Sequence, residues 1–205
     1  MIGIIDYGCG NILAISNVYK RLKIQTKIVS NISELDKSIT RLILPGVGAF
    51  DEAVSKLKDS GLIDKLNEAV IEQRLPVLGI CVGMQIMSKA SEEGALEGLN
   101  WIPGNVKRFD DKLFETYPKT PHMGWNEINL LKDCKLFEGI DKERGFYFIH
   151  SYYYECLEKK NSLAKTFYGN EFDSAVNLDN IYGVQFHPEK SHSNGITLFK
   201  NFSEL

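Results

Sequence analysis

The sequence predicts an α/β protein, a three-layer sandwich in which helices cover a mostly parallel central sheet. Up to about residue 90, short apolar runs alternate with segments of helical periodicity, a pattern typical of parallel strands joined by crossover helices. Beyond about residue 100 the pattern changes to shorter strand-like pieces, which indicates extra antiparallel strands in the second half.

The first half is expected to supply the parallel strands and most of the helices. Ile12, Ile15 and Val18 recur at helical spacing after the first apolar run. Asp51 follows the third run and is of a type that caps helices. The expected strands are residues 2–7, 24–29, 42–44 and 76–80. The expected helices are residues 11–22, a helix capped by Asp51, residues 62–70 and a segment around 84–87.

The second half is expected to be strand-rich and to end in a short helix. Its expected strands are residues 105–109, 126–130, 146–155, 163–167 and 181–186. The helix is expected over 196–202, after Ser193-Asn194-Gly195. Internal repeats and Pro/Gly/Ser-rich linkers are missing from the sequence, so residues 1–205 are expected to form one domain.

Composition excludes several classes of protein. The chain is 43% hydrophobic and 25% charged, close to the averages for globular proteins, so disorder and coiled-coil rods are not expected. Lys+Arg number 24 against 27 Asp+Glu, a net charge of -3, so global charge does not attract nucleic acid or anionic lipid. We therefore expect neither a nucleic-acid nor a membrane partner.

The cysteines and the start of the chain favour the cytosol. Apolar stretches fall short of the roughly 20 residues of a membrane span. The first residues open directly into a strand-like run without a signal-peptide pattern. The four cysteines lack CxxC pairing, which favours reduced thiols over disulfides or a zinc site. We expect a cytoplasmic protein that needs no metal or cofactor.

Cys81 lies in a pattern typical of a nucleophile elbow. The segment 79–83, Gly-Ile-Cys-Val-Gly, follows an apolar strand and precedes a helix, with Cys in place of the usual Ser. Glycines are required because the turn is too tight for side chains on both flanks. The N-terminus of the following helix favours thiolate, the attacking form. An isolated cysteine is more often a buried packing residue, but this context predicts a nucleophile.

A second motif, His187-Pro188-Glu189, follows the last apolar strand. Pro188 favours an extended conformation at His187, and extended residues i and i+2 project to the same side, about 6 to 7 Å apart. Glu189 can then accept a hydrogen bond from one ring nitrogen while the other faces Cys81, giving a Cys-His-Glu arrangement. Alone, this tripeptide would more often be a surface turn.

Two other strand ends are expected at the same sheet edge. The turn 44–48 can place a backbone N–H of Val47 or Gly48 opposite that of Val82, and two such donors form an oxyanion hole. The segment 6–11 contains a GxG, but it lacks the third glycine of a dinucleotide fingerprint. Cys9 is expected to be a packing thiol.

Six segments together resemble the motifs of class I glutamine amidotransferases, in the same order and over almost the whole chain. The segment Pro-His-Met-Gly-Trp-Asn resembles, more specifically, the glutaminase subunits of imidazole glycerol phosphate synthase. The segments are residues 6–11, 44–50, 79–85, 121–126, 150–153 and 183–191. The resemblance implies the flavodoxin-like amidotransferase fold.

The resemblance also implies the site and its chemistry. Its catalytic triad is Cys81, His187 and Glu189. Gly48, Gln85 and Ser151 would hold the substrate, L-glutamine. The implied activity is hydrolysis of glutamine to glutamate and ammonia through a cysteine thioester. Ammonia would pass to a partner synthase, a (β/α)8-barrel cyclase of histidine biosynthesis.

Four residues in or beside these motifs are candidates for the interface with that partner: Asn11, Trp125, Tyr147 and Lys190. Two features depart from the family pattern. Val82 replaces a usual Leu, which leaves its backbone donor intact, and the segment 192–194 has no assigned role.

Three alternatives stay open at the level of sequence. A paralogous glutaminase could supply ammonia for amidation of a surface sugar. An esterase or peptidase could use the same elbow with Asp173 or Asp179 as its acid. An inactive subunit could only regulate a partner, but the intact Cys81, His187 and Glu189 argue against that role.

Overall fold

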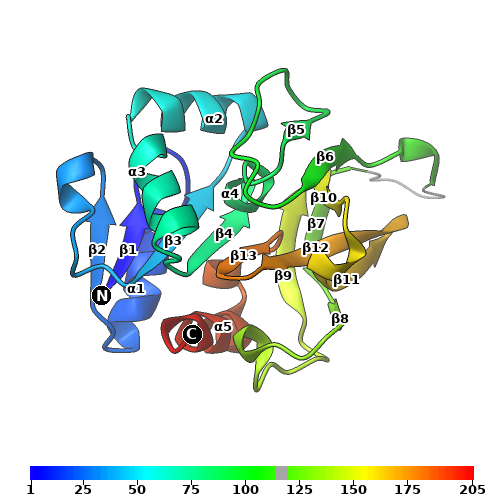
Figure 1. Cartoon of the computed structure of the whole chain (residues 1–205). Helices are drawn as coiled ribbons and strands as arrows, with labels where there is room; N and C mark the ends of the chain where they lie inside the picture. Colours follow the sequence, from blue (N-terminus) through cyan, green and yellow to red (C-terminus); the bar gives the residue numbers. More distant parts are fainter. Residues whose placement is uncertain (114–119) are drawn as a thin grey trace.

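Five parallel strands form the half of the central sheet that carries most of the motifs (Figure 1). The computed structural model describes residues 1–113 and 120–205 of the chain. In spatial order the strands are β2 (Thr26–Val29), β1 (Ile2–Ile5), β3 (Arg41–Gly46), β4 (Val77–Cys81) and β13 (Ile181–Val184). Strands β1 and β4 are buried along their whole length, as continuous apolar runs predict for strands covered on both faces.

The second half extends this sheet with mostly antiparallel strands. Next to β13 lie β12 (Asn170–Leu178), β10 (Tyr152–Cys156), β6 (Gly104–Arg108) and β5 (Ala90–Ser91). Strand β12 also pairs with β11 (Ser162–Tyr168), which pairs with β8 (Asn129–Leu130). A separate antiparallel pair consists of β7 (His122–Asn126) and β9 (Phe146–His150). The expected fold class is confirmed.

Helices cover the parallel strands on two sides (Figure 1). Helices α1 (Ile12–Arg21) and α5 (His192–Ser203) lie together, and the rings of Tyr19 and Phe199 are 5.2 Å apart between them. On the other side lie α2 (Phe50–Asp59) and α3 (Ile63–Asn67), which continues into the π-helical turn η2 (Glu68–Glu72). The one-turn helix α4 (Val82–Gln85) follows β4 directly.

Two predicted helix starts are wrong. Asp51 does not cap α2: the cap position is Ala49, and Glu93 accepts from the backbone N–H of Phe50 at 2.8 Å. The Asp51 carboxylate instead accepts from the backbone N–H groups of Ala95 and Leu96. A tertiary contact has replaced the local cap.

Helix α5 begins at His192 rather than at residue 196, so Ser193-Asn194-Gly195 lies within it. Asn194 is buried and donates to the carbonyls of Asp141 and Gly145, which holds the helix start against the preceding loop.

The strand predictions of the second half are partly wrong. Residues 126–130 were expected to be one strand, but β7 ends at Asn126 and β8 begins at Asn129. The expected strand 146–155 is broken at Ser151 into β9 and β10, which belong to different sheets. Strand β12 was not predicted, because its buried Asp173 and Ser174 interrupt the apolar pattern.

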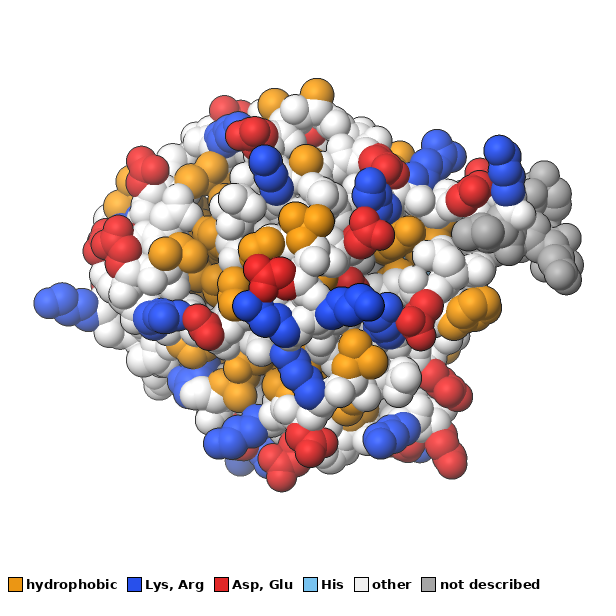
Figure 2. Space-filling model, turned by 45° about the vertical axis from the view of Figure 1, so that its right-hand side comes forward, with side chains coloured by type: hydrophobic (Ala, Val, Ile, Leu, Met, Phe, Trp, Pro, Cys, Tyr) orange, Lys and Arg blue, Asp and Glu red, His pale blue; other side chains and the backbone are white. Residues whose placement is uncertain are grey.

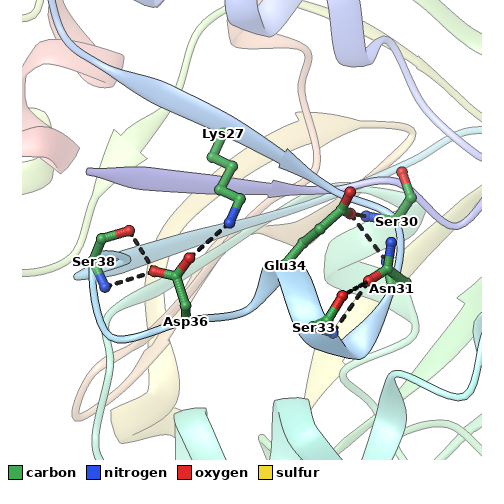
Figure 3. Close-up of polar contacts among 7 residues, drawn as sticks. All are labelled: Lys27, Ser30, Asn31, Ser33, Glu34, Asp36 and Ser38. Carbon is green, nitrogen blue, oxygen red and sulfur yellow. Dashed lines mark hydrogen bonds and ion pairs between the residues drawn. The ribbon is translucent and has the colours of Figure 1, made fainter.

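Local polar contacts shape the connection from β2 to β3 (Figure 3). Asn31 and Glu34 form a capping box on the 3-10 turn η1 (Ile32–Glu34). Lys27 forms an ion pair with Asp36 at 2.7 Å, and Ser38 also donates to that carboxylate. Hydrogen bonds from Lys27 and Ser38 hold the pKa of the Asp36 carboxyl well below its usual range. The remaining 3-10 turns are η3 (Asp111–Leu113), η4 (Lys135–Phe137), η5 (Lys159–Asn161) and η6 (Pro188–Lys190).

Figure 2 shows Lys and Arg side chains interspersed with Asp and Glu over one face of the molecule, in keeping with the small net charge of -3. Across residues 1–113 and 120–205, no helix has the length and apolar character needed to span a bilayer.

Candidate active site

The carboxyl ends of β3, β4 and β13 meet at one edge of the sheet, as their parallel register requires. Gly46 at the end of β3 is in register with Cys81 at the end of β4. His187 follows β13 after two further residues. The topology therefore brings together the three segments that carry the elbow, the adjacent turn and the histidine.

Cys81 has the strained backbone of a nucleophile elbow. Its φ is 55° and its ψ is -114°, a combination that non-glycine residues rarely adopt. A Cβ on Gly83 would overlap the carbonyl of Leu44, and one on Gly79 would overlap the backbone of α4. The expected need for glycine on both sides of Cys81 is therefore met by the geometry. Helix α4 is a single turn, so only its first N–H groups can act on the sulfur.

His187 and Glu189 form a buried hydrogen-bonded pair. His187 Nδ1 donates to Glu189 Oε1 at 2.8 Å, and their side chains are 3% and 2% exposed. His187 is extended, as its position before proline predicts, but Pro188–Lys190 forms the 3-10 turn η6, so the expectation of an extended Glu189 is wrong. The turn still delivers the carboxylate to the ring.

Backbone contacts hold His187 in place. Its N–H donates to the carbonyl of Tyr147 at 2.8 Å, and the hydroxyl of Ser191 donates to its carbonyl at 2.6 Å. The same Ser191 oxygen accepts from the N–H of Tyr147 at 3.0 Å. These bonds join β9, the end of β13 and the start of α5.

The electrostatics favour a charged histidine. Burial alone would lower the pKa of His187, but the neighbouring Cys81 sulfur and Glu189 carboxylate raise that pKa to about 10. With Nδ1 bonded to Glu189, Nε2 is the ring nitrogen that remains for proton exchange with Cys81. Burial would raise the pKa of Glu189, yet hydrogen bonds from His187 and Asn11 hold it below its usual range. An imidazolium between a sulfur and a carboxylate can support a thiolate.

A cavity of about 510 Å³ opens beside Cys81 and His187. Its size fits a small substrate rather than a macromolecule. Most of the other predicted site residues also line it: Asn11, Val47, Gly48, Val82, Gln85, Ser151 and Lys190. Trp125 and Tyr147 lie outside this lining.

The turn after β3 is held close to the elbow. The hydroxyl of Tyr7 donates to the carbonyl of Pro45 at 2.7 Å, and Gly48 has a φ of +95°. A Cβ on Gly46 would overlap the N–H of Gly83, which demonstrates how closely the two turns approach. Val47, Gly48 and Val82, the residues predicted to supply oxyanion donors, thus border the same cavity.

The interface candidates divide into two groups. Trp125 is 47% exposed and stacks on His192, with ring centroids 5.3 Å apart and an interplanar angle of 5°. Lys190 Nζ lies 5.7 Å from the ring of Tyr147, which contacts Trp125 edge to face. Asn11 differs, because its amide nitrogen donates to Glu189 Oε1 at 2.7 Å. His192, which had no role assigned from sequence, therefore belongs with Trp125 in an exposed cluster.

Sequence reasoning missed two groups of buried polar residues beside the cavity. Gln185 is fully buried, and its amide nitrogen lies 3.7 Å from Cys81 Sγ. His150 borders the cavity, and its Nε2 is 2.9 Å from Nδ1 of His122. A polar glutamine inside the apolar run 181–186 is the signal that could have found Gln185. Among the described residues, no group of three or more His, Cys, Asp or Glu is arranged to hold a metal ion.

Comparison of the sequence with known protein families shows which family the chain belongs to. The family described as glutamine amidotransferase class-I matches residues 3–204. The chain belongs to the class I glutamine amidotransferases, and the resemblance inferred from its motifs is confirmed.

Curated relatives narrow the likeness within that family. The imidazole glycerol phosphate synthase subunit HisH of Leptospira interrogans is 49% identical over 205 residues, which cover 100% of both chains. The HisH 2 subunit of Methanococcus maripaludis is 50% identical over 202 residues, 98% of each chain.

Solved structures share the fold. The crystal structure of a glutamine amidotransferase has a TM-score of 0.72 at 20% identity and covers 99% of this chain and 97% of that one. The crystal structure of a glutamine amidotransferase from Thermotoga maritima has a TM-score of 0.66 at 14% identity, covering 99% and 83%.

Proposed function

We propose that this chain is the glutaminase subunit of an imidazole glycerol phosphate synthase and supplies ammonia for histidine biosynthesis. The relatives named as HisH subunits match it over 98 to 100% of their length. The observation that carries the chemistry is His187, which borders the same cavity as Cys81 and is hydrogen-bonded to the buried Glu189 carboxylate. The whole chain, 1–205, acts as one amidotransferase domain in this proposal.

The reaction starts at the Cys81 sulfur. The thiolate attacks the side-chain carboxamide carbon of L-glutamine and forms a C–S bond. The carbonyl oxygen becomes an oxyanion, which the backbone N–H of Val82 and one from Val47 or Gly48 stabilise. His187 donates its proton to the leaving nitrogen as the C–N bond breaks, and ammonia departs. The enzyme is left as a glutamyl thioester.

Water completes the cycle. Neutral His187 now accepts a proton from water, which attacks the thioester carbon and breaks the C–S bond. Glutamate leaves, and Cys81 and His187 return to the thiolate and imidazolium. Glu189 stabilises the imidazolium through its 2.8 Å hydrogen bond and keeps Nε2 turned toward the sulfur.

Glutamine recognition falls to cavity residues beside the sulfur. Gly48, Gln85 and Ser151 all line the cavity and are proposed to bind the α-amino and α-carboxylate groups of the substrate. A site that hydrogen-bonds the α-amino and carboxylate groups should reject analogues that lack them. Replacing Ser151 with Ala should therefore raise KM for glutamine while Cys81 keeps its reactivity toward a small alkylating agent.

The partner is proposed to be a (β/α)8-barrel synthase that consumes the ammonia. Trp125, Tyr147 and Lys190 contact one another and are the proposed contact surface, together with Asn11, which lines the cavity as Lys190 does. All four cysteines are free thiols, which suits the cytosol as the place of action.

A labelling experiment tests the proposal directly. A glutamine analogue that carries an electrophile should modify Cys81 and abolish glutamine hydrolysis in the presence of the synthase. Peptide mapping should find the label on Cys81 and leave Cys9, Cys134 and Cys156 unmodified. Label on another cysteine, or full activity in Cys81→Ser, would contradict the mechanism. Activation only by a sugar-amidating synthase would contradict the pathway.

A further inference from the structure

Gln185 is a buried amide that contacts Cys81 and Gln85, two residues that line the active-site cavity. It follows β13 by one residue, is 0% exposed, and its backbone N–H donates to the carbonyl of Ser174. A buried amide is costly unless its polar atoms find partners. Both ends of this side chain are paired, and both partners are residues of the proposed site.

Gln185 bridges the nucleophile and a substrate-binding residue. Its Nε2 donates to Cys81 Sγ at 3.7 Å, and its Oε1 accepts from Gln85 Nε2 at 3.1 Å. The second hydrogen of Gln85 Nε2 goes to the carbonyl of Tyr152 at 3.0 Å. Both donors of Gln85 are therefore used, and its amide oxygen remains as the acceptor available to the cavity that Gln85 lines.

A further chain of hydrogen bonds fixes the carbonyl of Tyr152. A carbonyl only accepts, so His150 Nδ1 donates to it at 2.8 Å, and His150 Nε2 must accept from His122 Nδ1. Burial lowers the pKa of both rings, of His150 to about 3 and of His122 to about 4, so both are neutral near pH 7. The orientation of the Gln85 amide is thus fixed by two acceptors, Gln185 Oε1 and the carbonyl of Tyr152.

We infer that Gln185 is a positioning residue that donates a hydrogen bond to the Cys81 sulfur and at the same time holds the Gln85 amide with its oxygen toward bound substrate. The inference rests on the proposed glutaminase function and adds a residue to its site. A donor on sulfur stabilises the anionic form over the thiol. A held amide lowers the entropic cost of substrate binding.

The first test compares wild type with Gln185→Glu, which keeps the shape and replaces the donor with an acceptor. Alkylation of Cys81 by iodoacetamide is followed against pH, with peptide mapping to isolate this thiol. The titratable groups facing Cys81 are His187, from the segment after β13, and Tyr7, from the turn after β1, and neither is altered. The half-maximal rate should move to higher pH, with about three- to tenfold slower alkylation at pH 7.

The second test uses Gln185→Met, which removes both hydrogen bonds and covers the case in which the Glu variant fails to fold. It should slow alkylation and also raise KM for glutamine about three- to tenfold. Gln85→Met should raise KM and leave the alkylation profile unchanged. Exposed Gln25→Glu is the matched control and should change neither quantity.

The alkylation arm needs no substrate, so it is independent of the proposed function. Wild-type alkylation profiles and KM values in both Gln185 variants would overturn the inference. A shift in the alkylation profile together with no glutamine hydrolysis by wild type plus synthase would instead retain the sulfur contact and reject the glutaminase.

Discussion

Asn11 and Glu189, 178 residues apart in the sequence, are joined by a 2.7 Å hydrogen bond. The acceptor is Oε1, the same oxygen that accepts from His187 Nδ1 at 2.8 Å. The segment between β1 and α1, which carries Asn11, therefore helps to orient the carboxylate of the proposed triad. Asn11 was expected only at the partner interface, and this contact gives it a second role.

Replacing Asn11 with Ala should lower kcat for glutamine hydrolysis by roughly 10- to 100-fold, because a hydrogen bond to a charged group is lost. KM should change less, since Asn11 acts on Glu189. Asn31→Ala, in the η1 capping box, is the control and should leave kcat unchanged (Figure 3). Full kcat in Asn11→Ala, with weaker synthase binding, would return Asn11 to the interface alone.

Removing the imidazole should stop proton transfer. His187→Ala is expected to lower turnover by roughly 10² to 10⁴-fold, the usual contribution of a general acid and base. His192→Ala removes an exposed histidine that stacks on Trp125 and should leave hydrolysis by the isolated chain near wild type. Steady-state assays of glutamine hydrolysis compare the two variants. If His187→Ala is as active as His192→Ala, His187 has no part in the mechanism.

Gly83→Ala should disable the elbow. The new Cβ would overlap the carbonyl of Leu44 and force β3 and α4 apart. A displacement near 1 Å at the nucleophile costs about 100-fold in rate. Gly61→Asn is the control, because Gly61 has open space around it and asparagine tolerates its φ of +70°. The rate of glutamine hydrolysis and the melting temperature should both fall in Gly83→Ala. An unchanged rate would mean that the elbow accommodates the extra methyl group.

The buried pair of His122 and His150 should make the fold sensitive to acid. Their pKa values of about 4 and about 3 lie below the ordinary 6.5, so the unfolded chain binds more protons between pH 6.5 and 4. The contribution of this neutral pair to the free energy of unfolding is therefore fully present above pH 6.5 and is lost as the pH falls. At pH 5 the loss is about 2 kcal/mol per histidine.

Urea unfolding of wild type and His122→Gln at pH 7 and pH 5 measures this effect. The variant keeps a donor and an acceptor but has one titrating ring fewer, so about half of the histidine-linked acid loss should disappear. His187 does not interfere, because its raised pKa of about 10 places its own loss of stability between pH 6.5 and 10. Equal acid loss in both proteins would contradict the neutral pair.

Glutamine hydrolysis should be weak in the isolated chain and should rise when the synthase and its ligand bind. The partner can act only through a different affinity for active and inactive arrangements of the turns around the cavity. A typical coupling gives about 5- to 150-fold activation in kcat/KM. Trp125→Ala and Lys190→Ala should reduce this activation and leave the basal rate intact. Equal rates with and without synthase would exclude partner control.

Local motifs were sufficient to predict the sheet edge and the elbow at Cys81. The elbow could be found because a tight strand-to-helix turn demands glycine beside Cys81, and both flanking positions carry it. His187 and Glu189 could be paired because they lie two residues apart. The parallel strands could be found because buried strands are continuous apolar runs.

The tertiary structure alone decided the contacts that tune these groups. Sequence spacing says nothing of Asn11 beside Glu189, or of Gln185 between Cys81 and Gln85, because each contact depends on which strand ends become neighbours. Local signals also yielded to distant partners, as when Glu93 took the capping role expected of Asp51. Sequence therefore determined which groups this protein is proposed to use in the reaction, and packing between distant segments decided how their charges and orientations are held.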